Sequence, residues 1–125
     1  MTRKPAELKN LEVKEAYGKT VILNATYAYM PVGGNSPVTS TQEIRCNLWE
    51  KNGLRRLYLD GRDGRLGYWD VDRETWRPQD ARQEYLVQVI QAIAQAALEE
   101  IEREKTRQEE VKYRIAQAAW RAKGL

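Results

Sequence analysis

The chain has 125 residues and a formal net charge of +3, with 42% hydrophobic and 31% charged residues, a balance typical of one folded domain with a modest core. It contains no histidine and one cysteine. An internal disulfide is therefore excluded, a zinc site is disfavoured, and catalysis that depends on histidine is excluded. We expect a binding protein with no catalytic residues, no cofactor and no bound metal.

The sequence has no run of about 18 apolar residues, and the residues after Met1 are polar and charged rather than apolar. These features predict a cytoplasmic protein that does not enter a membrane. No segment is a polycation, so a surface that binds anions can form only where folding brings separate lysines and arginines together.

The N-terminal part of the chain changes character at Gly18. Residues 1–18 predict either a short helix that ends at this glycine or an arm that leads into a strand. Residues 19–30 are rich in β-branched and aromatic side chains and predict a strand. Residues 31–41 contain two prolines, two glycines and no charge, which predicts a loop.

The strongest local signal is Asn52-Gly53, which favours a two-residue hairpin turn between strands at residues 44–50 and 54–60. Such a turn fixes the pairing, and alternation then sorts the side chains onto two faces. One face holds Cys46, Leu48, Leu57 and Leu59. The other holds Arg45, Asn47, Trp49, Arg56, Tyr58 and Asp60. The separation of aliphatic from aromatic and polar side chains supports this register.

A second hairpin is predicted at Asp63-Gly64, leading into a strand at residues 66–71. A two-residue turn there places Trp69 beside Tyr58, on the face that carries Trp49. A slip of one residue exchanges Trp69 for Tyr68. In either register this face gains a third aromatic ring.

Residues 79–123 contain neither proline nor glycine and predict either one long helix or two helices broken near residues 102–110. An apolar stripe at helical spacing predicts the side that covers the aliphatic face of the sheet. Its members are Leu86, Val89, Ile90, Ile93, Ala97 and Ile101. The whole chain, 1–125, is therefore predicted to be a single α+β domain. An antiparallel sheet of about four strands within residues 19–77 is followed by a C-terminal helix or helical hairpin packed on one face.

The predicted aromatic and arginine face has the composition of proteins that bind single-stranded nucleic acid, in which bases stack on rings and arginines meet phosphates. The candidate residues are Arg45, Asn47, Trp49, Arg56, Tyr58 and Trp69, with Arg55 and Tyr27 or Tyr29 adjoining. Whether the ligand is DNA or RNA stays open. The alternative is that these rings pack beneath another element or a second subunit, because aromatic cross-strand pairs also stabilise sheets.

A second apolar cluster follows the charged stretch of the helical region, at Val111, Ile115, Ala119 and Trp120. It needs a partner, either by folding back or by pairing with another chain, and we expect a homo-oligomer formed through these residues. This leaves an alternative function as a protein–protein interaction or assembly module that acts through the helical C-terminal region.

Overall fold

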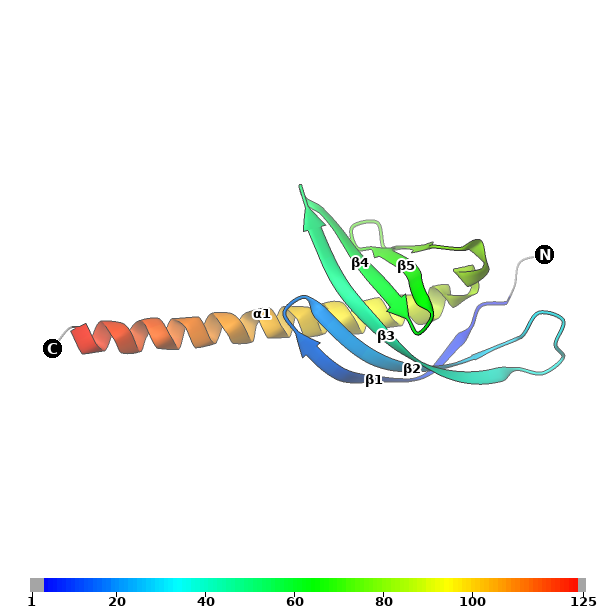
Figure 1. Ribbon diagram of the computed structural model, residues 1–125, viewed down its shortest axis with the longest axis horizontal. Coiled ribbons are helices and arrows are strands. Elements are labelled where there is room, and N and C mark those ends of the chain that lie inside the picture. The colour runs from blue at the N-terminus through cyan, green and yellow to red at the C-terminus, as the bar shows by residue number, and fades with distance from the viewer. Residues whose placement is uncertain (1–3, 124–125) are drawn as a thin grey trace.

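The computed structural model describes residues 4–123, with side chains described for residues 4–118. Within this range six strands form one antiparallel sheet in which each strand pairs with the next along the chain (Figure 1). The strands are β1 (Glu7–Tyr17), β2 (Thr20–Tyr29), β3 (Val38–Lys51), β4 (Leu54–Gly61), β5 (Gly64–Asp70) and β6 (Thr75–Pro78). A 3₁₀ helix, η1 (Ala81–Leu86), leads directly into α1 (Val87–Lys123). The predicted α+β class is confirmed, but the sheet has six strands rather than four.

The two strands that the sequence did not reveal are β1 and β6, at the edges of the sheet. Residues 7–17 form a strand, and its pairing with β2 shifts between Leu8 and Asn10 and again between Val13 and Glu15. These irregularities interrupt the period of two by which a strand is recognised. Strand β6 has four residues and ends in proline, so its pattern is too short to stand out. The loop expected at 31–41 is confined to residues 30–37, because β3 begins at Val38.

The predicted hairpin at Asn52-Gly53 is confirmed. Both residues have positive φ angles, 52° and 80°, as a type I′ turn requires. The pairing of β3 with β4 follows the predicted register, with Cys46 opposite Leu59 and Trp49 opposite Arg56. The aliphatic and aromatic faces are therefore separated as the sequence indicated.

The aliphatic face lies against the first half of α1. All six residues of the predicted stripe are buried, and they meet side chains such as Leu23 and Leu57 from the sheet. Helix α1 contacts β1 and β2 near one edge and β5 and β6 at the other, so the sheet curls around it (Figure 1). The opposite side carries Trp49, Arg56 and Tyr58 and has no helix over it; we call it the open face.

The β4–β5 hairpin corrects the expected position of Trp69. Its turn lies at Arg62-Asp63, one residue earlier than predicted, and an irregularity follows next to Leu59. As a result Leu57 pairs with Trp69, which lies in the core with 7% of its surface exposed. Tyr68, opposite Tyr58, takes its place on the open face.

Trp76 of β6 lies across β5 at Gly67. A Cβ atom at position 67 would stand 2.8 Å from the indole ring, so only glycine leaves room for it. The indole nitrogen of Trp76 donates a hydrogen bond of 3.1 Å to the backbone carbonyl of Gln83 in η1. At the other edge, the Ala6 backbone nitrogen donates to the Tyr85 carbonyl. These contacts hold η1, and with it the start of α1, between the two edges of the sheet.

Helix α1 is continuous, so the prediction of one long helix is confirmed, and the alternatives of a break near residues 102–110 and of a helical hairpin are wrong. After Ile101, which is buried, the helix extends beyond the sheet (Figure 1). Val111 and Ile115 are exposed there, whereas the side chains of Ala119 and Trp120 lie outside the described residues. Over the described range, no helix has the combined length and apolar character needed to cross a membrane.

Candidate nucleic-acid interface

One row of open-face side chains runs across all six strands, perpendicular to them. Each member stands opposite the next in the strand register, so all project from the same side. The hydroxyl of Thr20 donates a hydrogen bond of 2.7 Å to the side-chain carbonyl of Asn47 within the row. The row consists of Tyr17, Thr20, Asn47, Tyr58, Tyr68 and Arg77.

Arg56 connects this row to Trp49. Its guanidinium carbon lies 4.7 Å from the ring centre of Tyr68 and 5.6 Å from that of Trp49. Both distances fall within the range of cation–π attraction. Trp49 is 37% exposed, while Tyr58 and Tyr68 are half-buried. The cation therefore lies among three rings that remain in contact with solvent.

The two tyrosines at the centre of the row form an aromatic pair. The ring centres of Tyr58 and Tyr68 are 5.5 Å apart and the planes are tilted by 51°. Arg65 lies over Tyr58 at 4.5 Å and forms an ion pair of 2.9 Å with Asp60. Arg56 donates a hydrogen bond of 3.4 Å to the Tyr58 hydroxyl, and this bond is the main cause of a raised Arg56 pKa.

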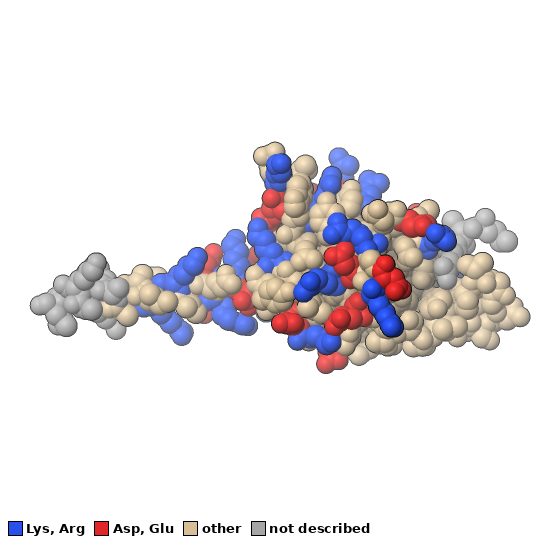
Figure 2. All heavy atoms as spheres, in the orientation of Figure 1, with Lys and Arg blue, Asp and Glu red and all other residues tan. Residues whose placement is uncertain are grey.

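Positive and negative charges alternate over this part of the surface (Figure 2). Lys14 and Lys19 are each bonded to a glutamate, at 2.7 and 3.3 Å. Arg45 instead donates a hydrogen bond of 2.9 Å to the Tyr17 hydroxyl, and neither it nor Arg56 forms an ion pair with a described carboxylate. The cations available to an anion are thus few and stand next to aromatic rings.

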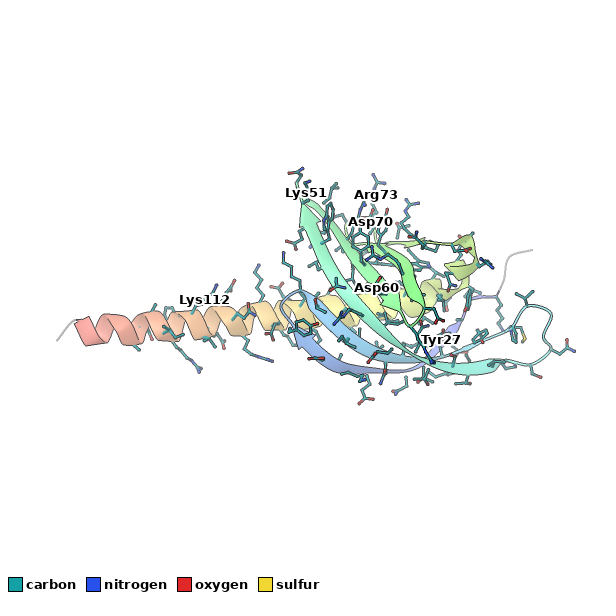
Figure 3. All side chains as sticks on the ribbon, viewed as in Figure 1. Tyr27, Lys51, Asp60, Asp70, Arg73 and Lys112 are labelled. Atoms are coloured by element: carbon teal, nitrogen blue, oxygen red, sulfur yellow. The ribbon has the colours of Figure 1, made fainter. Side chains whose placement is uncertain are left out.

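A hollow of about 720 Å³ lies beside the aromatic pair on the open face. Its walls include Ile22 from β2, Arg45 from β3 and Asp60 from β4. Asp60 lies near the middle of the sheet, while Lys51 and Arg73 lie at its upper rim (Figure 3). The hollow therefore extends the surface from the rings toward Arg45.

Three other candidate residues are not on the open face. Tyr27 is 5% exposed and points toward the core, and Tyr29, on the same side of β2, packs against Tyr85 at a ring distance of 5.9 Å. Arg55 is on the same side of β4 as Leu57, and its guanidinium forms an ion pair of 2.9 Å with the Asp72 carboxylate. The expectation that these side chains adjoin the aromatic face is wrong. For the two tyrosines the reason is the pairing of β2 with β3, which turns alternate residues of β2 from Val21 onward toward the helix. For Arg55 the reason is its position two residues before the buried Leu57 on β4.

The structure adds residues that the sequence did not single out. Tyr17 reaches the open face because residues 7–17 form a strand. Arg65 lies opposite Asp60 because the β4–β5 turn lies one residue earlier than expected. Tyr68 was indicated only as the outcome of a slip in register. The missing signal was the pairing of neighbouring strands, which no local pattern supplies at these positions.

The part of the chain that the structure describes contains no group of three or more histidine, cysteine or acidic side chains arranged to hold a metal ion. In comparisons with known proteins, no family model, curated protein or solved structure matches this chain.

Proposed function

We propose that this protein is non-enzymatic and binds single-stranded DNA or RNA across the open face of its sheet. The observation that carries the proposal is the position of Arg56, which lies over Tyr68 and Trp49 with no carboxylate partner among the described residues. Aromatic rings interleaved with unpaired arginines are the surface that unstacked bases and their phosphates require.

The rings offer stacking surfaces that differ in availability. Trp49 stands at the edge of the cluster and is the most exposed of the three. Tyr58 and Tyr68 are covered in part by Arg65 and Arg56. A base stacked on a ring contributes about 1–3 kcal/mol, whereas an exposed cation–π contact contributes about 0.5–1 kcal/mol. A base can therefore displace a guanidinium from a tyrosine, and the released guanidinium can bond a phosphate.

The electrostatic part of binding is expected to be small. Arg45, Arg56 and Arg77 are the open-face cations in this cluster without an ion pair to a described carboxylate, since Lys14, Lys19 and Arg65 are each paired. Three phosphate contacts on a single strand predict that log K falls with log salt at a slope of roughly −2.1. Stacking, rather than long-range attraction, supplies most of the affinity in this proposal.

The proposal includes no chemical step. The chain has no histidine, and Cys46, its one thiol, is buried with a pKa raised to about 12 by its burial. We assign the protein to the cytoplasm as part of the same proposal, because a solitary thiol is typical of a reducing compartment.

The test measures binding of labelled oligothymidine and oligouridine by fluorescence anisotropy, at low and at physiological salt. We expect Tyr58→Ala to weaken binding by roughly 5- to 150-fold, and Tyr58→Phe to retain it because the ring is kept. Tyr113→Ala is the matched control, since Tyr113 is 64% exposed on the distant part of α1. Arg82→Gln, outside the open face, is the control for Arg56→Gln.

A second readout uses the intrinsic fluorescence of Trp49. The measurement uses a Trp120→Phe background, because the side chain of Trp120 lies outside the described residues. Trp69 and Trp76 are buried, so quenching by a bound strand should then come mainly from Trp49 and should be lost in Trp49→Phe. The proposal is refuted if neither oligonucleotide binds at low salt, or if the Tyr58 and Tyr113 alanine variants lose affinity equally.

A second candidate function is a protein–protein interaction or assembly module that uses the helical C-terminal region. The observation that favours it is the part of α1 beyond the sheet, where Val111 and Ile115, four residues apart on one face, are 49% and 65% exposed. Apolar side chains at this exposure on a helix are typical of a face that has a partner. Charged substitutions at Val111 and Ile115 should then abolish association without affecting the open face.

A further inference from the structure

The second half of α1 has no neighbour within the described chain. Ile101 is the last buried residue among those whose side chains are described, and residues 102–118 are exposed apart from the partly buried Glu104. Lys112 marks this segment well beyond the sheet (Figure 3). At about 1.5 Å per residue, residues 102–123 extend for about 33 Å, roughly three heptads. We call this segment the projecting helix.

An apolar row on the projecting helix continues the face that packs against the sheet. From Ile101 onward, alternating steps of three and four residues lead through Val111 and Ile115. This alternation is the spacing at which two helices pack with interlocking side chains along a seam. The full row is Ile101, Glu104, Gln108, Val111, Ile115 and Ala118. Its two members after Ile101 are polar, and the row is apolar from Val111 onward. Its first member is buried by the sheet, while Val111 and Ile115 are 49% and 65% exposed.

Charge is divided along the same segment. Residues 102–110 contain four acidic and three basic residues, a net charge of −1, whereas residues 111–123 contain four basic and no acidic residues, a net charge of +4. Two such helices aligned in parallel would place the two +4 parts together. Two aligned in opposite directions place −1 against +4 at both ends of the contact. The charges of two projecting helices are therefore complementary only in the antiparallel alignment.

We infer that the projecting helix pairs antiparallel with the projecting helix of a second copy of this chain, with the twofold axis near Val111. The boundary between the acidic and basic parts gives this alignment, and the row of residues at alternating steps of three and four supplies the contact. It places Val111 against its own copy, Ile115 opposite Gln108, and Ala118 opposite Glu104. The helix dipole alone would also favour acidic residues near the N-terminus of a helix and basic residues near its C-terminus. It does not account for the exposed apolar side chains of Val111 and Ile115.

This pairing is independent of nucleic-acid binding, so its test contains no nucleic acid. Sedimentation equilibrium of the full chain should show a dimer that dissociates on dilution. Val111→Lys combined with Ile115→Lys should weaken the dimer by at least about a hundredfold, because two apolar side chains in each copy are replaced by charged ones that the contact would bury. Tyr113→Lys is the matched control on the same helix, off the apolar row. Far-ultraviolet circular dichroism and thermal unfolding check that each variant keeps its fold.

Disulfide crosslinking tests the direction of the pairing. In the antiparallel dimer, a Glu104→Cys chain mixed with an Ala118→Cys chain should form a crosslinked heterodimer under mild oxidation, and neither variant should crosslink efficiently with itself. A parallel dimer gives the reverse result. The inference is overturned by a chain that stays monomeric at every concentration, by a dimer that the double lysine variant leaves intact, or by self-crosslinking of each single variant.

Discussion

Gly67 and Trp76 are in direct contact across the β5–β6 pair, with the indole ring lying where a side chain at position 67 would project. Gly67 has a φ angle of 148°, and a Cβ atom there would lie 2.8 Å from the ring and would also collide with the backbone carbonyl of Arg77. This contact holds Trp76 where its ring nitrogen bonds to Gln83. One glycine thus fixes the position of the segment that leads into the helix.

Substitution of Gly67 by alanine should be among the most destabilising small changes in the chain. The positive φ contributes about 1–2 kcal/mol, and the collision with backbone and ring adds about 1–3 kcal/mol. Gly53→Ala is the matched control, since its φ is also positive, at 80°, but nothing lies within 4 Å of a Cβ there. Urea unfolding of the two variants should differ by at least about 1 kcal/mol. Equal losses would contradict the role given to the Trp76 contact.

Two isoleucines of α1 should differ sharply when replaced by alanine. Ile93 is fully buried against the sheet, so Ile93→Ala should lower the free energy of unfolding by about 2–5 kcal/mol. Ile115 is 65% exposed, and Ile115→Ala should change it by less than about 0.5 kcal/mol in dilute, monomeric protein. Chemical denaturation followed by circular dichroism measures both. A large loss for Ile115→Ala in the monomer would show that the projecting helix folds back onto the domain.

The thiol of Cys46 should resist modification in the folded protein. Its burial, with a smaller effect of the Asp60 charge, raises the Cys46 pKa from 9.0 to about 12. The reactive species is the thiolate, so a small thiol reagent at pH 8 should label Cys46 only as fast as the protein opens. In denaturant the same reagent should react at once. Rapid labelling of the native chain would contradict the burial of this strand.

The same pKa shift predicts how stability depends on alkaline pH. The folded thiol has the higher pKa, so its contribution is complete below pH 9 and is lost as pH rises from 9.0 toward about 12. Cys46→Val removes the titrating group while keeping an apolar side chain. The stability difference between the wild type and this variant should therefore change over that range, as measured by urea unfolding at each pH. If the difference in unfolding free energy between the two proteins stays constant over this pH range, the raised Cys46 pKa is ruled out.

Asp72 should titrate below its ordinary pKa of 3.8. The main cause is hydrogen bonding from the Arg55 side chain, whose nitrogens donate to the carboxylate at 2.9 and 3.1 Å. Because the folded pKa is the lower one, the stabilising contribution is present above pH 3.8 and is lost as pH falls through the folded value. Arg55→Gln should raise the Asp72 pKa toward 3.8, which carboxyl carbon NMR can follow. Arg62→Gln, at an exposed turn, should leave it unchanged.

Local chemistry in the sequence determined the β3–β4 hairpin and the buried side of α1. Asn52 and Gly53 adopt positive φ readily, and a two-residue turn leaves only one register, so the faces of Leu57 and Tyr58 follow directly. The stripe from Leu86 to Ile101 was equally readable, because helical spacing alone gathers it on one side. These features depend on neighbours within a few residues.

Tertiary structure decided which aromatic rings share the open face. A shift of one residue reverses every side chain of a strand, and the shift that buries Trp69 and exposes Tyr68 arises at the irregularity in the β4–β5 pair. The resulting register also lets Trp76 from β6 lie over Gly67. Strand β1 likewise shows its alternation only when paired with β2, and Tyr17 reaches the row through that pairing. These strand registers depend on the burial of residues from separate strands, so no local stretch of sequence determines them.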